Sequence, residues 1–205
     1  MSLTIYGMAP SRTFRVLWAA HELGLDYDLK PYSFLGPEIS QPAYLAINPN
    51  AAIPAITDGD LNLFESLAIT LYLAQKTGKL WPATLEDQAR TYQWTLWAAT
   101  EVEPLLGAWA YHTLFLPPEE RKPEVAADAA AKLPKRFAVL EGVLQDRDYL
   151  LGSKFAIADL NVAAVLYRAP QFGIAGYPRL SAGHRRCYER PAAQAAVALR
   201  EPKAA

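Results

Sequence analysis

Cysteine is almost absent from this sequence of 205 residues, which contains only Cys187. A single thiol excludes a disulfide framework within the chain and any Cys-x-x-Cys redox pair. Neither sign of charge is in excess, since the net charge is −1. The sequence therefore gives no electrostatic reason to expect binding to nucleic acid or to an anionic membrane surface.

Long apolar runs and a targeting segment are also missing. No apolar run reaches the ~18 residues that a helix needs to span a bilayer. The first four residues, MSLT, have no basic stretch followed by an apolar core, unlike a secretory signal. We therefore expect a soluble, cytoplasmic protein in a reducing compartment, with no membrane partner.

The rest of the composition is typical of a packed globular protein, with 52% hydrophobic and 20% charged residues. Signals for strands and helices alternate over residues 1–77, whereas the strong signals in residues 88–205 are helical. This order predicts an α/β N-terminal domain and an all-α C-terminal domain. Residues 78–87 (GKLWPATLED) are the expected linker.

Local patterns predict the elements on both sides of that linker. Gly24 is expected to end the first helix, and Gly78 the helix before the linker. In the second half, Pro104 predicts a kink, and Pro134 predicts a bend or a break. Asp159 is expected to cap a helix, with half of the capping box missing because Ala156 has no hydroxyl. Strands are predicted at 3–6 and 27–31, a short irregular or helical piece at 40–47, and helices at 88–112, 123–144, 157–167 and 192–200.

The most informative stretch is residues 48–76, NPNAAIPAITDGDLNLFESLAITLYLAQK. Pro54 suits the first residue of a strand, because proline cannot donate to a sheet ladder. Asp-Gly at 58–59, between two short apolar runs, is a strong signal for a hairpin. Glu65-Ser66 then lies where a strand ends and a helix begins. Free backbone N–H groups and the helix dipole favour a carboxylate-bearing ligand at such a point.

This ordered set resembles the glutathione-binding half of the glutathione S-transferases. The family pattern is Asn-Pro, three variable residues, an apolar residue with Pro, a hairpin, Glu-Ser and an apolar helix. The chain resembles the cytosolic, bacterial-like members with a serine-type active site, over nearly its whole length. The resemblance implies a thioredoxin-like first domain. The matching residues are Asn48-Pro49, Ile53-Pro54, Asp58-Gly59, Glu65-Ser66, Ala68-Ile69 and Tyr72-Leu73.

Glutathione conjugation needs a thiolate, because a free thiol has a pKa of ~8.5 and is mostly protonated at neutral pH. The resemblance implies that Ser11, four residues before Arg15, donates a hydrogen bond to the sulfur. Ser11 also fits an N-cap role, which is compatible with catalysis. Tyr6 is the alternative catalytic residue, since other members use a tyrosine at the end of the first strand. Thr13 is a minor alternative.

The resemblance also assigns the glutathione-binding residues. Pro54 is expected to be cis, so that the backbone of Ile53 pairs with the cysteinyl part of glutathione. Glu65 is expected to accept from the ammonium of the γ-glutamyl end, and Ser66 to meet its carboxylate. A plain helix cap is the alternative role for Ser66.

Ala52 departs from the family pattern, because Lys or Gln there often meets the glycyl carboxylate of glutathione. Alanine cannot supply that charge, and Arg12 and Lys30 are candidate replacements. The resemblance places the acceptor site between the domains, and an apolar, aromatic lining suits a small hydrophobic electrophile. Each aromatic residue also fits simple core packing. The expected lining residues are Met8, Pro10, Trp109, Tyr111, His112 and Phe115.

Taken together, the resemblance implies a transferase that uses glutathione as cosubstrate, with no metal. Relatives use the same thiolate in peroxidase, dehalogenase or isomerase chemistry, and these alternatives stay open. A non-catalytic interaction module of the same fold is the alternative outside enzymes. The resemblance also implies a homodimer, and no nucleic-acid partner is expected.

Overall fold

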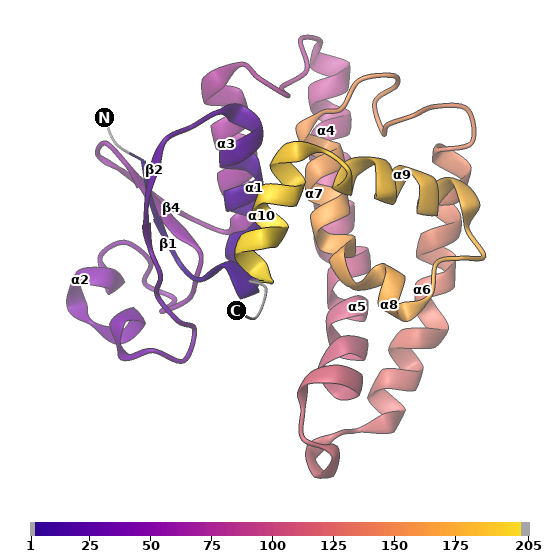
Figure 1. Cartoon of the computed structure of the whole chain (residues 1–205), viewed down its shortest axis with the longest axis horizontal. Helices are drawn as coiled ribbons and strands as arrows, with labels where there is room; N and C mark the ends of the chain where they lie inside the picture. The colour runs from indigo at the N-terminus through magenta and orange to yellow at the C-terminus, as the bar shows by residue number, and fades with distance from the viewer. Residues whose placement is uncertain (1–2, 202–205) are drawn as a thin grey trace. The chain divides into compact units, whose positions relative to one another are not determined.

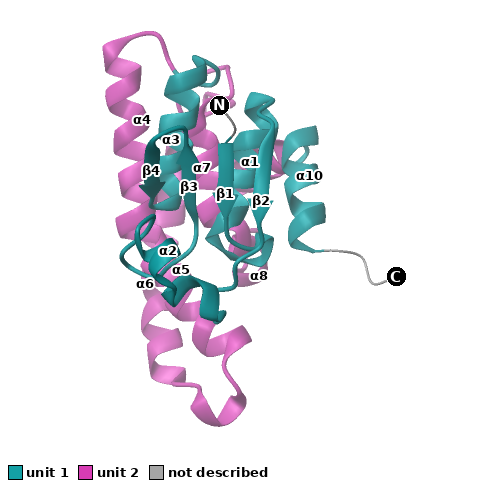
Figure 2. Ribbon diagram, turned by 90° about the vertical axis from the view of Figure 1, so that its left-hand side faces the viewer, with its two compact units in different colours: residues 1–81, 189–205 teal, residues 82–188 magenta. Residues whose placement is uncertain are grey.

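The computed structural model describes residues 3–201 of the chain (Figure 1). It contains two compact units, drawn in different colours in Figure 2. One consists of residues 1–81 together with 189–205, and the other of residues 82–188. The expected domain boundaries differ from these limits and stay predictions, since a compact unit need not coincide with a domain.

The first unit is built on a four-stranded mixed sheet with the order β2-β1-β3-β4 (Figure 2). The central strand β1 is parallel to β2 and antiparallel to β3, and β3 is antiparallel to β4. A parallel pair needs a crossover, which here contains the first helix. The strands are β1 (Leu3–Tyr6), β2 (Tyr27–Lys30), β3 (Ala55–Asp58) and β4 (Leu61–Phe64).

The hairpin between β3 and β4 forms where expected, but its turn lies one residue later. Asp58 is the last residue of β3 and pairs with Leu61, so Gly59 and Asp60 form the turn. Gly59 has a φ of 61°, which glycine tolerates without a steric penalty. The Asp58 carboxylate accepts hydrogen bonds from Tyr72 and Lys76, and these contacts hold Asp58 within the strand.

Four helices complete this unit: α1 (Phe14–Leu23), α2 (Pro42–Leu45), α3 (Ser66–Thr77) and α10 (Pro191–Arg200). Gly24 and Gly78 follow α1 and α3 in the left-handed conformation, which confirms the two predicted helix ends. Figure 1 shows α2 on one side of the sheet and α1, α3 and α10 on the other.

Each face of the sheet packs against its own apolar cluster, because successive strand residues point to opposite faces. Ile5 and Ile56 are fully buried in the cluster that includes residues of α1 and α3. Their neighbours Tyr6 and Ala55 face the other cluster, with Tyr44 of α2. Because the two faces are distinct, the ends of α1 and α3 lie on the opposite face from Tyr6.

The second unit is helical. Its long first segment is not one continuous α-helix: it passes through π-helical turns at Ala98–Val102 and Tyr111–Phe115. Pro104 lies in the first turn of the helix that follows the first of these turns, where its missing N–H is not needed. The helices are α4 (Leu85–Trp97), α5 (Glu103–Ala110), α6 (Pro123–Val143), α7 (Ile157–Val165), α8 (Ala169–Phe172) and α9 (Pro178–Tyr188).

Parts of this unit differ from the sequence expectation. The sequence predicted a bend or a break at Pro134, and the break is wrong, because α6 continues through that residue. α9 was not predicted, because its sequence PRLSAGHRRCY is rich in arginine and has few apolar residues to mark a buried face. Its buried positions are Leu180, Gly183 and Cys187, which recur at intervals of three and four residues.

Asp159 has the structural role expected at the start of α7. Its carboxylate accepts from the backbone N–H of Ala156 at 2.9 Å, which is the half of the capping box that the sequence retains. The other carboxylate oxygen accepts from the N–H of Leu150 at 2.7 Å. One buried side chain therefore holds both the helix start and the preceding loop.

Candidate functional site

Ser11 lies in the irregular segment Ala9–Thr13 that joins β1 to α1. Its backbone is extended, with φ −139° and ψ −167°, and α1 begins three residues later. The N-cap position of α1 is therefore Thr13, and the expectation of a simple N-cap role for Ser11 is wrong. The Ser11 hydroxyl instead accepts a hydrogen bond from the Thr13 N–H at 3.1 Å.

The Ser11 hydroxyl is also placed to donate. Its oxygen is 2.7 Å from the Met8 carbonyl and 2.9 Å from the Thr13 hydroxyl oxygen. A hydroxyl has one hydrogen, so it donates to one of these acceptors at a time. Rotation about the C–O bond lets the hydroxyl donate to a ligand instead, while it keeps the hydrogen bond from Thr13.

Tyr6, the alternative catalytic residue, belongs to an aromatic cluster on the other face of the sheet. Its ring centroid lies 5.6 Å from that of Tyr32 and 5.7 Å from that of Tyr44. Burial raises the pKa of Tyr44, a member of this cluster, to about 12. These contacts favour Ser11 over Tyr6.

Gly7 allows the Ser11 segment to lie next to the Ile53–Pro54 loop. A Cβ atom at Gly7 would lie 2.1 Å from the Thr13 hydroxyl oxygen and 3.2 Å from the Ile53 Cβ. Its φ of +140° also disfavours any other residue. Two segments that are about forty residues apart in the sequence therefore meet at a glycine.

The Ile53–Pro54 peptide bond is cis, as predicted. The loop before it is fixed through the Ala52 carbonyl, which accepts from the Tyr44 hydroxyl at 2.6 Å and from the Asn48 side-chain amide at 2.7 Å. Asn48 is buried, so the first residue of the sequence motif acts as a support for this loop. The Ala52 side chain is exposed.

Glu65 and Ser66 lie where β4 ends and α3 begins. Glu65 has a φ of 71° and a ψ of 106°, a conformation that non-glycine residues rarely adopt. Such backbone strain occurs most often at ligand sites. Ser66 is the first residue of α3 and is 4% exposed, and its hydroxyl accepts from a guanidinium nitrogen of Arg15 at 3.1 Å.

The structure therefore brings together the predicted glutathione-binding residues within the first unit. Gly7 joins the Ser11 segment to Ile53, and Arg15 joins α1 to Ser66. The positive ends of two helix dipoles and one buried guanidinium favour an anion here. Sequence reasoning placed Arg15 four residues after Ser11 but did not predict its contact with Ser66.

The two candidate replacements for a basic residue at position 52 differ in their surroundings. Lys30 forms an ion pair with Asp28 at 2.7 Å, and this hydrogen bond raises the pKa of Lys30. Arg12 has an exposed side chain next to Ser11. Both stay candidate replacements for a basic residue at position 52.

The expected acceptor-site residues are divided between the units. Met8 and Pro10 belong to the Ser11 segment, and the other four residues lie in the helical unit. Trp109 packs edge-on against Phe172, with 5.1 Å between the ring centroids, and both side chains are half-buried. The His112 Nδ1 atom accepts from the backbone N–H of Lys122 at 3.2 Å.

Two of these residues are open to solvent, since Tyr111 is 53% and Phe115 55% exposed. The guanidinium of Arg168 lies over the Phe115 ring, 4.4 Å from its centroid.

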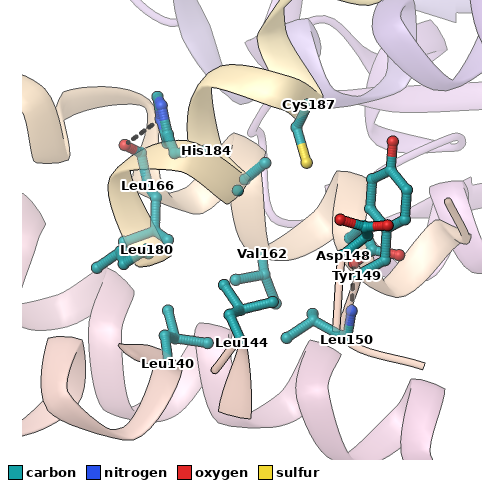
Figure 3. A pocket seen from close by; sticks show the side chains of 13 residues that line it. Leu140, Leu144, Asp148, Tyr149, Leu150, Val162, Leu166, Leu180, His184 and Cys187 are labelled. Atoms are coloured by element: carbon teal, nitrogen blue, oxygen red, sulfur yellow. Dashed lines mark hydrogen bonds between the residues drawn. The ribbon is translucent and has the colours of Figure 1, made fainter. Parts of the chain in front are cut away.

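The helical unit contains a small apolar cavity of about 30 Å³ (Figure 3). The Cys187 sulfur points into it, and the His184 ring is held at its wall by a 3.2 Å contact with the Leu166 carbonyl. No residue predicted for catalysis, glutathione or the acceptor lines this cavity. Its wall consists mainly of the aliphatic residues Leu140, Leu144, Leu150, Val162, Ala163, Leu166 and Leu180.

No helix within residues 3–201 is both long enough and apolar enough to cross a membrane. Within the same residues, no three His, Cys, Asp or Glu side chains are grouped so that they could hold a metal ion.

Two family models match this chain. The N-terminal domain of glutathione S-transferase matches residues 1–75, and the C-terminal domain matches residues 104–191. This chain belongs to the glutathione S-transferase family. The expected enzyme class, glutathione S-transferase, and the fold of a thioredoxin-like part with a helical part are thereby confirmed.

Individual relatives of this glutathione S-transferase match nearly its full length. Glutathione S-transferase 1 of Zea mays is 32% identical, covering 98% of this chain and 99% of the relative. The solved structure of maize glutathione S-transferase I with an atrazine–glutathione conjugate has a TM-score of 0.90 and 31% identity, covering 100% of both chains. A theta-class enzyme of Xanthomonas axonopodis pv. citri, solved with glutathione bound, has a TM-score of 0.88 and 29% identity. That match covers 96% of this chain and 97% of the other.

Proposed function

We propose that this enzyme binds glutathione in its first unit and uses Ser11 to stabilise the thiolate for attack on a hydrophobic electrophile. The observation that carries the proposal is the Ser11 hydroxyl, which accepts from the Thr13 N–H and whose hydrogen can rotate from the Met8 carbonyl or the Thr13 hydroxyl toward a ligand. The serine-type, bacterial-like assignment is part of the same proposal. The sulfur forms a bond to the electrophilic carbon, and the leaving group departs or the adduct takes up a proton.

The chemistry requires the thiol pKa to fall from ~8.5 by about two units, which corresponds to about 3 kcal/mol. A donated hydrogen bond at the start of a helix stabilises the anion and lowers the pKa in this way. Ser11 supplies the donor, and α1 supplies the dipole. The hydrogen bond from Thr13 polarises the Ser11 hydroxyl and makes it a better donor.

Glutathione is oriented by the contacts that surround Ser11. Glu65 accepts from the γ-glutamyl ammonium, and Ser66 with its N–H binds the adjacent carboxylate. The backbone of Ile53 pairs with the cysteinyl part, next to the cis Pro54. The glutathione-bound Xanthomonas relative and the conjugate-bound maize relative support glutathione as the cosubstrate.

The acceptor is a small hydrophobic electrophile. The atrazine conjugate in the maize relative supports an apolar, ring-containing acceptor. The proposed lining remains Met8, Pro10, Trp109, Tyr111, His112 and Phe115.

A homodimer is part of this proposal, and α4 supplies a suitable surface. Leu85, Tyr92 and Leu96 follow one another at helical spacing and are 75%, 44% and 62% exposed. A row of large apolar side chains on one helix face costs free energy in water, and burial against a second copy removes that cost.

Calorimetry with glutathione, combined with the ultraviolet absorbance of the thiolate against pH, tests the proposal. The wild-type enzyme should bind glutathione and lower its thiol pKa. Ser11→Ala should still bind glutathione but raise the thiol pKa toward its free value, whereas Tyr6→Phe should change neither. A wild-type protein that does not bind glutathione would overturn the proposal.

The same variants identify the catalytic residue, and a panel of substrates then identifies the reaction. A thiol pKa that rises in Tyr6→Phe instead of Ser11→Ala would transfer the role to Tyr6. A panel of aryl halides, peroxides and haloacids then distinguishes conjugation from peroxidase and dehalogenase activity, because all three need the same thiolate.

A further inference from the structure

The last helix of the chain ends at the segment that contains Ser11. α10 packs beside α1 in the first unit, and Figure 1 shows it in yellow next to the indigo helix. Its final residue is Arg200, almost two hundred residues after Ser11 in the sequence. The C-terminal end of the helix thus reaches a segment that no local sequence signal connects to it.

Arg200 contacts the Ser11 segment through its guanidinium. One nitrogen, Nη1, donates to the Ala9 carbonyl at 3.1 Å and to the Ser11 carbonyl at 2.9 Å. The Cζ atom lies 5.4 Å from the centroid of the buried Phe14 ring, within the range of a cation–π contact. Arg200 therefore holds the backbone on both sides of Pro10 and is itself held by the start of α1.

The Ser11 segment needs such a restraint because its backbone is irregular. Pro10 has a ψ of 35° and Ser11 a ψ of −167°, so neither has helical dihedral angles. Pro10 also has no N–H with which to form a backbone hydrogen bond. Contacts from outside the segment therefore add to the local hydrogen bonds that Ser11 forms with Met8 and Thr13.

The helix that carries Arg200 is firmly attached to α1. Arg190, just before α10, forms two hydrogen bonds of 2.7 Å to the two carboxylate oxygens of Glu22. Ala193 and Ala196 are completely buried, and their small side chains let the two helices approach closely. A bidentate ion pair at one end and Arg200 at the other fix the helix as an arm about 15 Å long.

We propose that Arg200 is a positioning residue that holds the Ala9–Ser11 backbone so that the Ser11 hydroxyl stays directed at the glutathione sulfur. The proposal rests on the proposed function of Ser11. Arg200 contacts neither the sulfur nor the acceptor in this role. Its guanidinium suits the task, because one planar cation donates to two carbonyl oxygens with little loss of side-chain freedom.

The consequence for catalysis follows from the geometry of a hydrogen bond. A shift of the segment by a fraction of an ångström lengthens the Ser11–sulfur contact and bends it, which weakens it steeply. Misplacement by about 1 Å costs enzymes up to about a hundredfold in rate. Loss of Arg200 should therefore weaken thiolate stabilisation and leave most of the glutathione contacts intact.

The test compares three variants of the full chain with the wild-type enzyme. Arg200→Ala removes both hydrogen bonds, and Arg200→Lys keeps a cation that can donate to at least one carbonyl. Arg190→Ala is the matched control, since it removes an arginine from the other end of the same helix arm. Glutathione affinity is measured by calorimetry, the bound thiol pKa by thiolate absorbance, and kcat and KM with an aryl halide.

In Arg200→Ala we expect the thiol pKa to rise by about one unit, which reduces the thiolate at neutral pH by up to about tenfold. The value of kcat should fall in parallel, with the KM for glutathione changed less than twofold. Arg200→Lys should recover part of both losses. Arg190→Ala should lower the melting temperature and raise the thiol pKa less than Arg200→Ala does, because Arg200 keeps its own contacts with the Ser11 segment.

Three results would overturn the proposal. If the thiol pKa of glutathione bound to Arg200→Ala equals that measured with the wild-type enzyme, Arg200 has a structural role only. If the thiol pKa rises equally in Arg190→Ala, the effect comes from the attachment of α10 to α1 and not from the contacts of Arg200 with the Ser11 segment. If Arg200→Ala does not fold, Arg200→Gln removes the cation with a milder change, and a wild-type thiol pKa there overturns the proposal equally. If the wild-type enzyme does not lower the thiol pKa of bound glutathione, the proposed function on which the role of Arg200 rests is overturned instead.

Discussion

Arg15 in α1 donates a hydrogen bond of 3.1 Å to the hydroxyl of Ser66, 51 residues later at the start of α3. Both side chains are buried, with 7% and 4% exposure. Because the Ser66 oxygen accepts from Arg15, its own hydrogen remains available to a ligand carboxylate. The contact connects the two helix starts on which the proposed glutathione site depends.

Ser66→Ala should weaken glutathione binding by about tenfold or more, because a hydrogen bond to a charged group contributes about 1.5–3 kcal/mol. Titration calorimetry measures the effect. The matched control is Thr77→Val, which changes a hydroxyl at the other end of the same helix, bonded to the Leu73 carbonyl. Equal affinities in Ser66→Ala and Thr77→Val would remove Ser66 from the site.

Ala52→Lys should strengthen glutathione binding about two- to fivefold, because an exposed ion pair contributes at most about 1 kcal/mol. The side chain at this position is exposed, and the supporting contacts of residue 52 use its carbonyl, so lysine fits without disruption. The affinity for γ-glutamylcysteine, which lacks the glycyl carboxylate, should stay unchanged. A gain for both ligands would show that the new cation does not meet that carboxylate.

The free energy of unfolding should decrease at acidic pH because of His184. Burial lowers the pKa of this side chain from 6.5 to about 4. Between these values the unfolded chain binds the proton and the folded chain does not, so stability decreases as pH falls from about 6.5 to 4. One pKa unit corresponds to about 1.4 kcal/mol, so the full loss is about 3 kcal/mol.

Urea unfolding of the wild-type enzyme and of His184→Gln over that pH range measures this contribution. The variant should lose less stability between pH 6.5 and pH 4, because glutamine does not titrate. Parallel pH profiles for the two proteins would contradict the assignment to His184.

Leu96→Glu should shift the enzyme from dimer to monomer, because it places a charge on the proposed apolar surface of α4. Sedimentation velocity measures the change. Val139→Glu is the matched control, since it alters an apolar residue of α6 that is 41% exposed. A wild-type monomer, or a dimer that survives Leu96→Glu, would contradict a homodimer through α4.

Much of the first unit follows from local sequence signals. The hairpin and the left-handed Gly24 and Gly78 each depend on neighbours within a few residues, so local sequence signals are sufficient to predict them. The cis Pro54 was expected from the family resemblance. The turn of the hairpin was misplaced by one residue because cross-strand pairing and the Lys76 contact keep Asp58 in the strand. Such pairing is a tertiary effect.

The helical unit was harder to predict, for a related reason. α9 has few apolar residues, so hydrophobic periodicity did not predict it. Its few buried positions can be recognised only when the residues that pack against them are known. Pro134 is accommodated within α6, although proline removes one helical hydrogen bond. Local propensity is a weak guide where tertiary packing supports the helix.

The sequence by itself determined the family and the residue types of the proposed glutathione site, because Ser11, Pro54, Glu65 and Ser66 lie in ordered local motifs. The tertiary structure alone decided what supports them: Arg15 against Ser66, Gly7 between two loops, and Arg200 on the Ser11 segment. The physical reason is the distance along the chain over which each interaction acts. Turn and helix preferences act over a few residues, whereas a guanidinium selects its carbonyl or hydroxyl partners only after the chain has folded them within about 3 Å of it.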